Sequence, residues 1–154
     1  PQTAYLITAL LRRVVDAGTA VKIRSLNINA AGKTGTTDSF DAWFVGFSAH
    51  LAAGVWFGVD DPQVSLGEKQ DGSRAALPAW ARFMKTVHDS MGWKYQSFDV
   101  PEGVSQVEIC KVTKDLPTRY CPTEKEYFIS RYSPSRTCRV HTEAATRRGR
   151  EREN

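Results

Sequence analysis

The sequence contains few cysteines and no long apolar run, and each shortage narrows the classes of protein that it can encode. Only three of its 154 residues are Cys and two are Met. Because three is an odd number, the cysteines cannot all pair with one another in disulfides within one chain. No apolar stretch approaches the roughly 20 residues that a transmembrane helix needs, so we predict no membrane span. The first residues, from Pro1 onward, lack a basic region and a cleavage site, so we read no signal peptide and expect the chain to continue a longer one.

A concentrated positive charge is also absent. The 21 basic and 17 acidic residues leave a net charge of +4, and this excess divides evenly between residues 1–95 and 96–154. Only the Arg-rich segment 147–152 gathers basic side chains, and an interrupted run at a chain end is typical of a solvated, disordered tail. We therefore predict no nucleic-acid partner, because such a partner requires basic residues gathered on one face.

A complete phosphate-binding loop is missing as well. Gly32-Lys33-Thr34 matches the end of the G-x-x-x-x-G-K-[ST] pattern, but Asn27 occupies the position where that loop needs its first glycine. The loop must also open directly into a helix, whereas the segment after Thr36 leads into residues typical of a strand. These two departures disfavour the nucleotide-binding interpretation.

The sequence does contain two amphipathic helices. Apolar residues recur at helical spacing between Thr3 and Gly18, and we expect Thr3 to cap this helix and Gly18 to end it in a left-handed conformation. A second helix is predicted to begin near Pro78, which favours a first turn, and to end at Gly92.

Strands are predicted between these helices. The apolar runs 43–47 and 51–59 have the length and aromatic content of central strands covered on both faces, joined as an antiparallel hairpin. Residues 21–29 alternate loosely and predict the approach to a further strand. A helix, three strands and a helix indicate an α+β fold, with an antiparallel sheet packed against helices.

The composition changes after residue 95. Segment 96–154 contains all three cysteines, four of the seven prolines and no long periodic element, although 104–112 favours a strand. We predict that residues 1–95 form part of one α+β domain and that residues 96–154 form a loop-rich β tail whose end is disordered.

One motif carries chemistry. Lys33-Thr34-Gly35 resembles the Lys-Thr-Gly motif of penicillin-recognising serine acyl transferases, where it lies on an edge strand that lines the site. The Lys33 ammonium provides positive potential, while the hydroxyls of Thr34 and Thr36 can bind a substrate carboxylate. Gly35 leaves space for a substrate along the strand, and the N–H of Thr36 can donate to an oxyanion, a contact worth a few kcal/mol in the transition state.

The surroundings of this motif are more specific than the motif itself. Over roughly residues 3–105 the chain closely resembles class A, bifunctional penicillin-binding proteins. Five segments carry this resemblance: Ala4-Tyr5-Leu6-Ile7-Thr8-Ala9-Leu10-Leu11, Ala31-Gly32-Lys33-Thr34-Gly35-Thr36-Thr37, Asp41-Ala42-Trp43-Phe44-Val45-Gly46-Phe47, Gly54-Val55-Trp56-Phe57-Gly58-Val59-Asp60-Asp61-Pro62 and Ala75-Ala76-Leu77-Pro78-Ala79-Trp80. The resemblance implies the C-terminal part of a transpeptidase domain with the penicillin-binding protein and serine β-lactamase-like fold, followed by a C-terminal tail.

The same resemblance implies a function. Members of this family cross-link peptidoglycan stem peptides through a serine acyl-enzyme formed on D-Ala-D-Ala, and β-lactams occupy the site as substrate mimics. They are bifunctional, membrane-associated enzymes with an additional glycosyltransferase activity, and they act on the periplasmic side of the bacterial inner membrane. By this resemblance Lys33 and the Thr36 N–H are catalytic, Thr34, Gly35 and Thr36 bind substrate, and neither a cofactor nor a metal is expected.

The family's nucleophile is missing from this sequence. That nucleophile is the serine of S-x-x-K, and no serine here is followed by Lys three residues later. Ser25-Leu26-Asn27 matches S-x-N in form, but it lies only six residues before Lys33, whereas the family places S-x-N far upstream. We therefore predict that S-x-x-K and S-x-N belong to an N-terminal part of the same enzyme, and that the isolated chain is inactive. The alternative is a non-catalytic module that binds another component of the cell envelope.

The cysteines leave three alternatives open. A disulfide, with Cys121 and Cys138 as the favoured pair, suits a compartment outside the cytoplasm and would hold a loop-rich module together. Cys138-x-x-His141 together with the other cysteines matches a Cys3His zinc site, which is disfavoured because no C-x-x-C pair is present. Unpaired thiols are the third possibility.

We expect the remaining histidines and the large aromatic residues to have structural rather than catalytic roles. We expect His50, in the hairpin turn, and His88, on the second helix, to be solvated. We expect four aromatic residues to lie in the core: Trp43, Trp56, Trp80 and Phe83.

Overall fold

The structure is a computed structural model, and it describes residues 1–37, 40–61 and 64–143. The chain separates into two compact units: a larger unit, Ile7–Asp99, and a smaller unit that combines Pro1–Leu6 with the residues from Val100 onward. The predicted domain boundary after residue 95 stays a prediction, and the predicted disorder of the chain end falls on residues 144–154, outside the described part. Among the described residues, no helix is both long and apolar enough to cross a bilayer.

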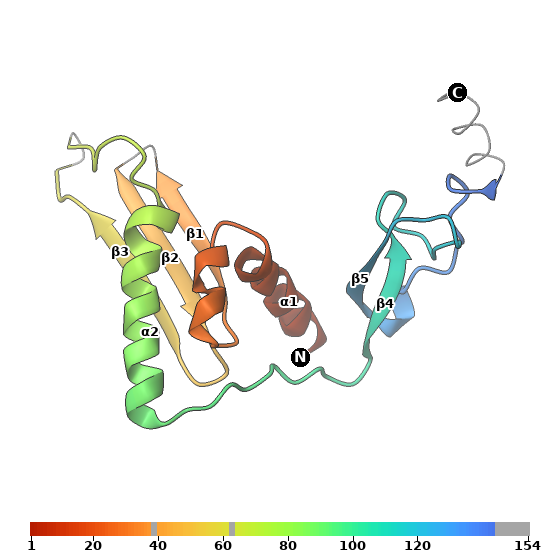
Figure 1. Ribbon diagram of the computed structural model, residues 1–154, viewed down its shortest axis with the longest axis horizontal. Coiled ribbons are helices and arrows are strands. Elements are labelled where there is room, and N and C mark those ends of the chain that lie inside the picture. Colours follow the sequence, from red (N-terminus) through yellow and green to blue (C-terminus); the bar gives the residue numbers. More distant parts are fainter. Residues whose placement is uncertain (38–39, 62–63, 144–154) are drawn as a thin grey trace. The chain divides into compact units, whose positions relative to one another are not determined.

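A three-stranded antiparallel sheet forms the centre of the larger unit, as Figure 1 shows. Its strands are β1 (Ala31–Thr37), β2 (Asp41–Phe47) and β3 (Ala52–Gly58), in that spatial order. The two apolar runs thus form the predicted antiparallel hairpin. The strand with the Lys-Thr-Gly motif, β1, pairs along its whole length with β2 and lies at the edge of the sheet.

One face of this sheet packs against helix α2 (Leu77–Met91) and forms the core. The ring of Phe44, on β2, is fully buried and meets the buried Trp80 ring edge-on, with ring centroids 5.0 Å apart. Trp80 also donates its indole N–H to the carbonyl of Ala53 at 2.9 Å, which satisfies its polar atom. Burial of a side chain as large as Phe44 contributes roughly 2–3 kcal/mol, so this aromatic contact fixes α2 on the sheet.

The opposite face of the sheet is exposed in the described part of the chain. Trp43 and Trp56 each remain 43% exposed, and their rings lie 6.1 Å apart on neighbouring strands. Successive side chains of a strand point to opposite faces, so the inward position of Phe44 places Trp43 outward. The predictions that both faces are covered and that Trp43, Trp56 and Phe83 belong to the core are therefore wrong for these residues, and Trp80 alone of the four is buried.

The segment before β1 differs from its prediction. Helix α1 spans Gln2–Asp16, so Thr3 lies inside its first turn, and Gly18 does not adopt the expected left-handed conformation. A Cβ on Gly18 would lie 2.8 Å from the Cα of Val14, so close packing explains this glycine. Residues predicted to approach a strand form a 3-10 helix, η1 (Val21–Leu26), which buries Ile23 and ends at Asn27 with φ 54°.

Helix α2 agrees with its prediction at both ends. Pro78 lies in its first turn, and Gly92 ends it at φ 65°, donating its N–H to the carbonyls of His88 and Asp89. A short π-helical turn, η2 (Gly72–Ala76), leads into α2. The Asp71 carboxylate accepts hydrogen bonds from the hydroxyl of Ser73 and from the backbone N–H groups that begin this turn, which lowers the pKa of Asp71.

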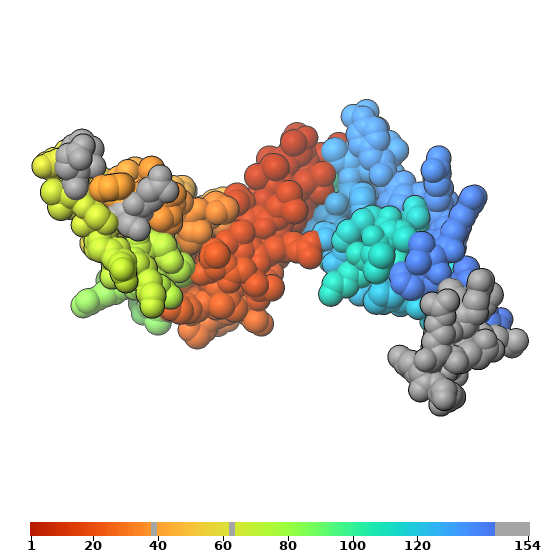
Figure 2. All heavy atoms as spheres, turned by 90° about the horizontal axis from the view of Figure 1, so that it is seen from above, coloured from red at the N-terminus to blue at the C-terminus, as the bar shows by residue number. Residues whose placement is uncertain are grey.

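The smaller unit contains an antiparallel pair of strands, β4 (Val104–Cys110) and β5 (Thr123–Ile129), followed by a 3-10 turn, η3 (Ser130–Tyr132). The strand predicted within 104–112 is thus confirmed. In Figure 2 residues 100–143, teal to blue, form one compact body. Few apolar side chains are buried there: Tyr5, Ile109, Cys110 and Cys138.

His88 is the clearest error in the sequence-based assignment of polar residues. Its exposed fraction is 6%, and its Nε2 lies 3.0 Å from the hydroxyl of Ser48. His50 lies in the exposed hairpin turn as expected and stacks on Trp93, 4.8 Å between centroids, while Trp93 meets the His88 ring edge-on. Burial of the ring, reinforced by the nearby His50, lowers the pKa of His88, and Asp89 opposes this shift only in part.

This lowered pKa predicts that acid destabilises the larger unit. The unfolded state, with a His pKa near 6.5, takes up a proton before folded His88 does, so the free energy of unfolding should decrease as pH falls below about 6.5. All four tryptophans lie in the larger unit, so urea unfolding followed by Trp fluorescence between pH 7.5 and 5.5 reports on that unit. A His88→Gln variant should lose this dependence, whereas unchanged or rising stability of the parent chain toward pH 5.5 would contradict the assignment.

Candidate functional site

The Lys-Thr-Gly motif lies in the middle of edge strand β1. Lys33 and Thr36 are exposed, while Thr34 and Gly35 are half-buried. Thr34 is opposite Phe44 in the register with β2, so the two Thr side chains share the face of the sheet that packs on α2, and Lys33 belongs to the other face. The motif therefore presents hydroxyls and an ammonium on two sides of one strand edge.

The ammonium of Lys33 lies close to the backbone of its own strand. Its Nζ donates a hydrogen bond to the carbonyl of Thr34 at 2.7 Å. An exposed ammonium with three donors keeps further capacity for an anion. The Lys33 ammonium thus lies beside Thr34, and its role in catalysis stays a prediction.

Both threonine hydroxyls already contact residues outside the motif. The Thr34 Oγ1 lies 3.1 Å from the Thr19 Oγ1, and the Thr36 Oγ1 accepts a hydrogen bond from the N–H of Gly72 at 3.2 Å. Because the Gly72 N–H is the donor, the Thr36 hydroxyl keeps its own proton to donate to an anion. Thr19 and Gly72 were missed by the sequence analysis, since no motif links either residue to β1.

Gly72 fixes the turn η2 against the edge of the sheet. A Cβ built on Gly72 would lie 2.2 Å from the carbonyl oxygen of Trp43 and 2.7 Å from that of Gly35. Both atoms belong to backbone and cannot move aside as a flexible side chain would. The absence of a side chain at position 72 therefore permits the contact that holds η2 on the Lys-Thr-Gly strand.

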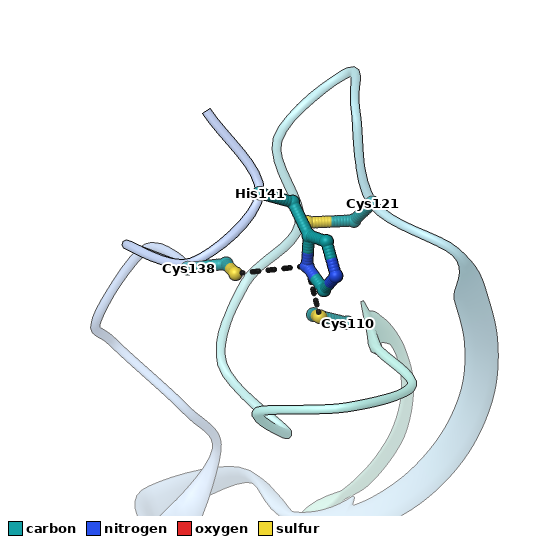
Figure 3. A group of neighbouring side chains, drawn as sticks. All are labelled: Cys110, Cys121, Cys138 and His141. Carbon is teal, nitrogen blue, oxygen red and sulfur yellow. Dashed lines mark hydrogen bonds between the residues drawn. The ribbon is translucent and has the colours of Figure 1, made fainter. Parts of the chain in front are cut away.

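The three cysteines gather with His141 in the smaller unit, as Figure 3 shows. Cys110 ends β4, Cys121 lies in the loop before β5, and Cys138 with His141 comes from the segment after η3. All three cysteines are free, so the favoured Cys121–Cys138 disulfide is absent. One potential ligand atom from each of the four residues lies within 4.8 Å of all the others, an arrangement at odds with the expectation of no metal site.

Hydrogen bonds within this cluster shift its acid–base equilibria. The backbone N–H of His141 stabilises the thiolate of Cys138 and lowers its pKa to about 5. Burial raises the pKa of Cys121. Burial also acts to raise the pKa of Cys110, but hydrogen bonds from Thr113 act in the opposite direction, and the pKa of Cys110 is lowered overall. The contact with Cys138 raises the pKa of His141.

Comparisons with known proteins agree on one family. A family model described as "Penicillin-binding protein 1A, C-terminal domain" matches residues 100–143. Penicillin-binding protein 1A of Aquifex aeolicus is 41% identical over 130 residues, which are 84% of this chain and 18% of the relative. Penicillin-binding protein 1A of Clostridium tetani is 32% identical over 150 residues, 92% of this chain and 19% of the relative.

A solved structure extends the similarity to the fold. The crystal structure of penicillin-binding protein 1A from Haemophilus influenzae is similar with a TM-score of 0.79 and 31% identity, over 89% of this chain and 21% of that one. The fold and the edge-strand motif thus define a penicillin-binding protein of the α+β transpeptidase-type fold. The chain belongs to the penicillin-binding protein 1A family. It spans about a fifth of the length of the relatives that it matches.

Proposed function

We propose that this chain forms one wall of the active site of a bacterial peptidoglycan D,D-transpeptidase, on the periplasmic side of the inner membrane. The observation that carries the proposal is the position of Lys33, Thr34 and Thr36 on an edge strand of a chain that belongs to the penicillin-binding protein 1A family. An edge strand leaves alternate backbone groups unpaired by the sheet, so an extended peptide can lie along it.

The chemistry of the motif suits a stem peptide that ends in a carboxylate. The Lys33 ammonium raises the local positive potential, and the Thr34 and Thr36 hydroxyls donate to the substrate carboxylate. A serine attacks the carbonyl carbon of the penultimate D-Ala, and the carbonyl oxygen then gains negative charge. The Thr36 N–H donates a hydrogen bond to this oxyanion. The terminal D-Ala then leaves, and the amine of a second stem peptide attacks the acyl-enzyme to form the cross-link. β-Lactams would acylate the same serine.

The attacking serine and its general base are proposed to lie in the N-terminal part of the same enzyme. No S-x-x-K sequence occurs in the 154 residues, and Ser25 lies in η1, where its hydroxyl donates to the carbonyl of Lys22. Without a nucleophile, the contacts supplied by β1 have no bond-forming step to accelerate. The chain therefore contributes binding and electrostatic stabilisation to a site that another segment completes.

A fluorescent penicillin tests this division of roles. Incubated alone and then denatured, the 154-residue chain should carry no covalent fluorescence, whereas the larger enzyme that contains it should be labelled. Prior treatment of the larger enzyme with unlabelled penicillin should block the signal, which controls for non-specific attachment. Labelling of the isolated chain would place a nucleophile within it, and an unlabelled larger enzyme would favour the non-catalytic envelope-binding module.

A further inference from the structure

We propose that Cys110, Cys121, Cys138 and His141 bind one structural zinc ion, which closes the smaller unit of the protein. Three thiolates and one imidazole are a common ligand set of structural zinc sites. This site lies outside the Lys-Thr-Gly strand, and neither its existence nor its test depends on the proposed transpeptidase function.

The distances between the four side chains suit a tetrahedral ion. With zinc–sulfur bonds near 2.3 Å and zinc–nitrogen bonds near 2.1 Å, a tetrahedron separates sulfur from nitrogen by about 3.6 Å. The His141 Nδ1 lies 3.3 Å from the Cys110 sulfur and 3.4 Å from the Cys138 sulfur. The sulfur of Cys121 completes a set whose members all lie within 4.8 Å of one another, so small side-chain shifts bring four ligands to one centre.

The surrounding backbone orients these ligands. The N–H of Thr113 donates to the Cys110 sulfur at 3.5 Å, and the N–H of Thr118 donates to the Cys121 sulfur at 3.3 Å. The Thr118 hydroxyl donates to the carbonyl of His141 at 2.6 Å, which ties the loop that holds one ligand to the segment that holds another. Hydrogen bonds to coordinating sulfurs offset thiolate charge and fix ligand geometry.

The four ligands come from three parts of the chain. Cys110 is the last residue of β4, Cys121 lies in the loop just before the paired start of β5, and Cys138 and His141 follow η3. An isolated β-bridge between Leu116 and Thr137 joins the segment that holds Cys138 and His141 to the loop between β4 and β5. In this bridge the carbonyl of Leu116 accepts a hydrogen bond from the N–H of Cys138 at 2.8 Å. A two-stranded sheet with few buried apolar side chains is marginal by itself, and a metal supplies the missing stabilisation in such small units.

Zinc accounts for the whole cluster better than a disulfide does. A disulfide uses two sulfurs and leaves the third thiol and the imidazole without a role, although all four point to one centre in Figure 3. Sulfur-rich tetrahedral sites select zinc over magnesium or calcium, which prefer oxygen ligands. Four protein ligands leave no open coordination position, so the ion is structural rather than catalytic.

Metal analysis of the intact 154-residue chain tests the proposal. The chain is purified under reducing conditions, stripped with a chelator, reloaded with zinc and freed of unbound ion by gel filtration. Elemental analysis should then find about one zinc per chain. Cys138→Ser and His141→Ala should each lower this ratio several-fold, whereas the matched control His50→Ala, in the exposed hairpin turn of the larger unit, should keep it.

A spectroscopic measurement on the unaltered chain guards against variants that fail to fold. Cobalt in place of zinc should give the intense visible absorption of a tetrahedral thiolate site, and one equivalent of zinc should abolish it. The proposal is overturned if the parent chain retains no zinc, if zinc binding is the same in Cys138→Ser and His141→Ala, or if cobalt gives only the weak spectrum of an octahedral ion. It also fails if the enzyme isolated from its own compartment carries a Cys121–Cys138 disulfide and no zinc.

Discussion

Replacement of Gly72 by Ala should destabilise the larger unit by about 3 kcal/mol, at the upper end of the usual range for overpacking. The added Cβ would lie 2.2 Å from the carbonyl oxygen of Trp43, on β2, and 2.7 Å from that of Gly35, on β1, so η2 must move away from these strands or both strands must shift. Denaturant unfolding followed by Trp fluorescence measures this loss. In the larger enzyme, a displacement of β1 by about 1 Å should slow acylation by penicillin on the order of 100-fold.

Gly54→Ala provides the matched control for this substitution. A Cβ on Gly54 would lie 3.6 Å from a methyl group of Val45, an ordinary van der Waals contact, and Gly54 belongs to the same sheet. This variant should change the free energy of unfolding by less than about 1 kcal/mol and leave acylation unchanged. Equal effects of the two substitutions, or a stable and fully active Gly72→Ala enzyme, would disprove the positioning role of Gly72.

The elements that the sequence predicted correctly are those with a clear local pattern of apolar residues. Continuous apolar runs with aromatic residues predict β2 and β3, and one apolar helix face with Pro78 and Gly92 predicts α2, because local patterns and end signals act together there. Which face of the sheet is covered depends on the other elements that pack on it. Trp43 and Trp80 are equally apolar, yet one is exposed and the other buried.

Local patterns failed where tertiary contacts decide the structure. Residues 21–29 alternate loosely enough to indicate a strand, but the chain forms η1 there and directs Ile23 into the core. His88 lies on a helix face that is polar by sequence, and it is buried because the hairpin turn brings Ser48 to its ring. Neither contact has a signature in the neighbouring sequence.

For the candidate sites, too, local motifs were predictable from the sequence and tertiary contacts were not. The Lys-Thr-Gly motif and its flanking strands identified β1 from the sequence, whereas the contacts of Thr34 with Thr19 and of Thr36 with Gly72 join residues far apart in the chain. For the cysteines, the odd count and the spacing left several pairings open. The pairing of β4 with β5 and the bridge at Leu116 bring the four ligand atoms together, and these are tertiary features.

The second large effect is expected at Lys33. In the larger enzyme, Lys33→Ala removes the ammonium beside Thr34, and with it the positive potential that should hold the substrate carboxylate and stabilise the developing oxyanion. Removal of one such electrostatic contact typically slows an acyl transfer by a factor of about 100 to 1,000. Because the Lys33 side chain is exposed and its hydrogen bond is to its own strand, folding should be nearly unaffected.

The acylation rate of the larger enzyme with a fluorescent penicillin, compared between Lys33→Ala and Lys22→Ala, tests the central claim most directly. Lys22 is an exposed lysine of the same unit, located on η1 and outside the motif. We predict that Lys33→Ala is acylated at least about 100-fold more slowly than the parent enzyme, while Lys22→Ala reacts at the parent rate. Equal acylation rates for a folded Lys33→Ala enzyme and its Lys22→Ala control would contradict the assignment of β1 to the active site.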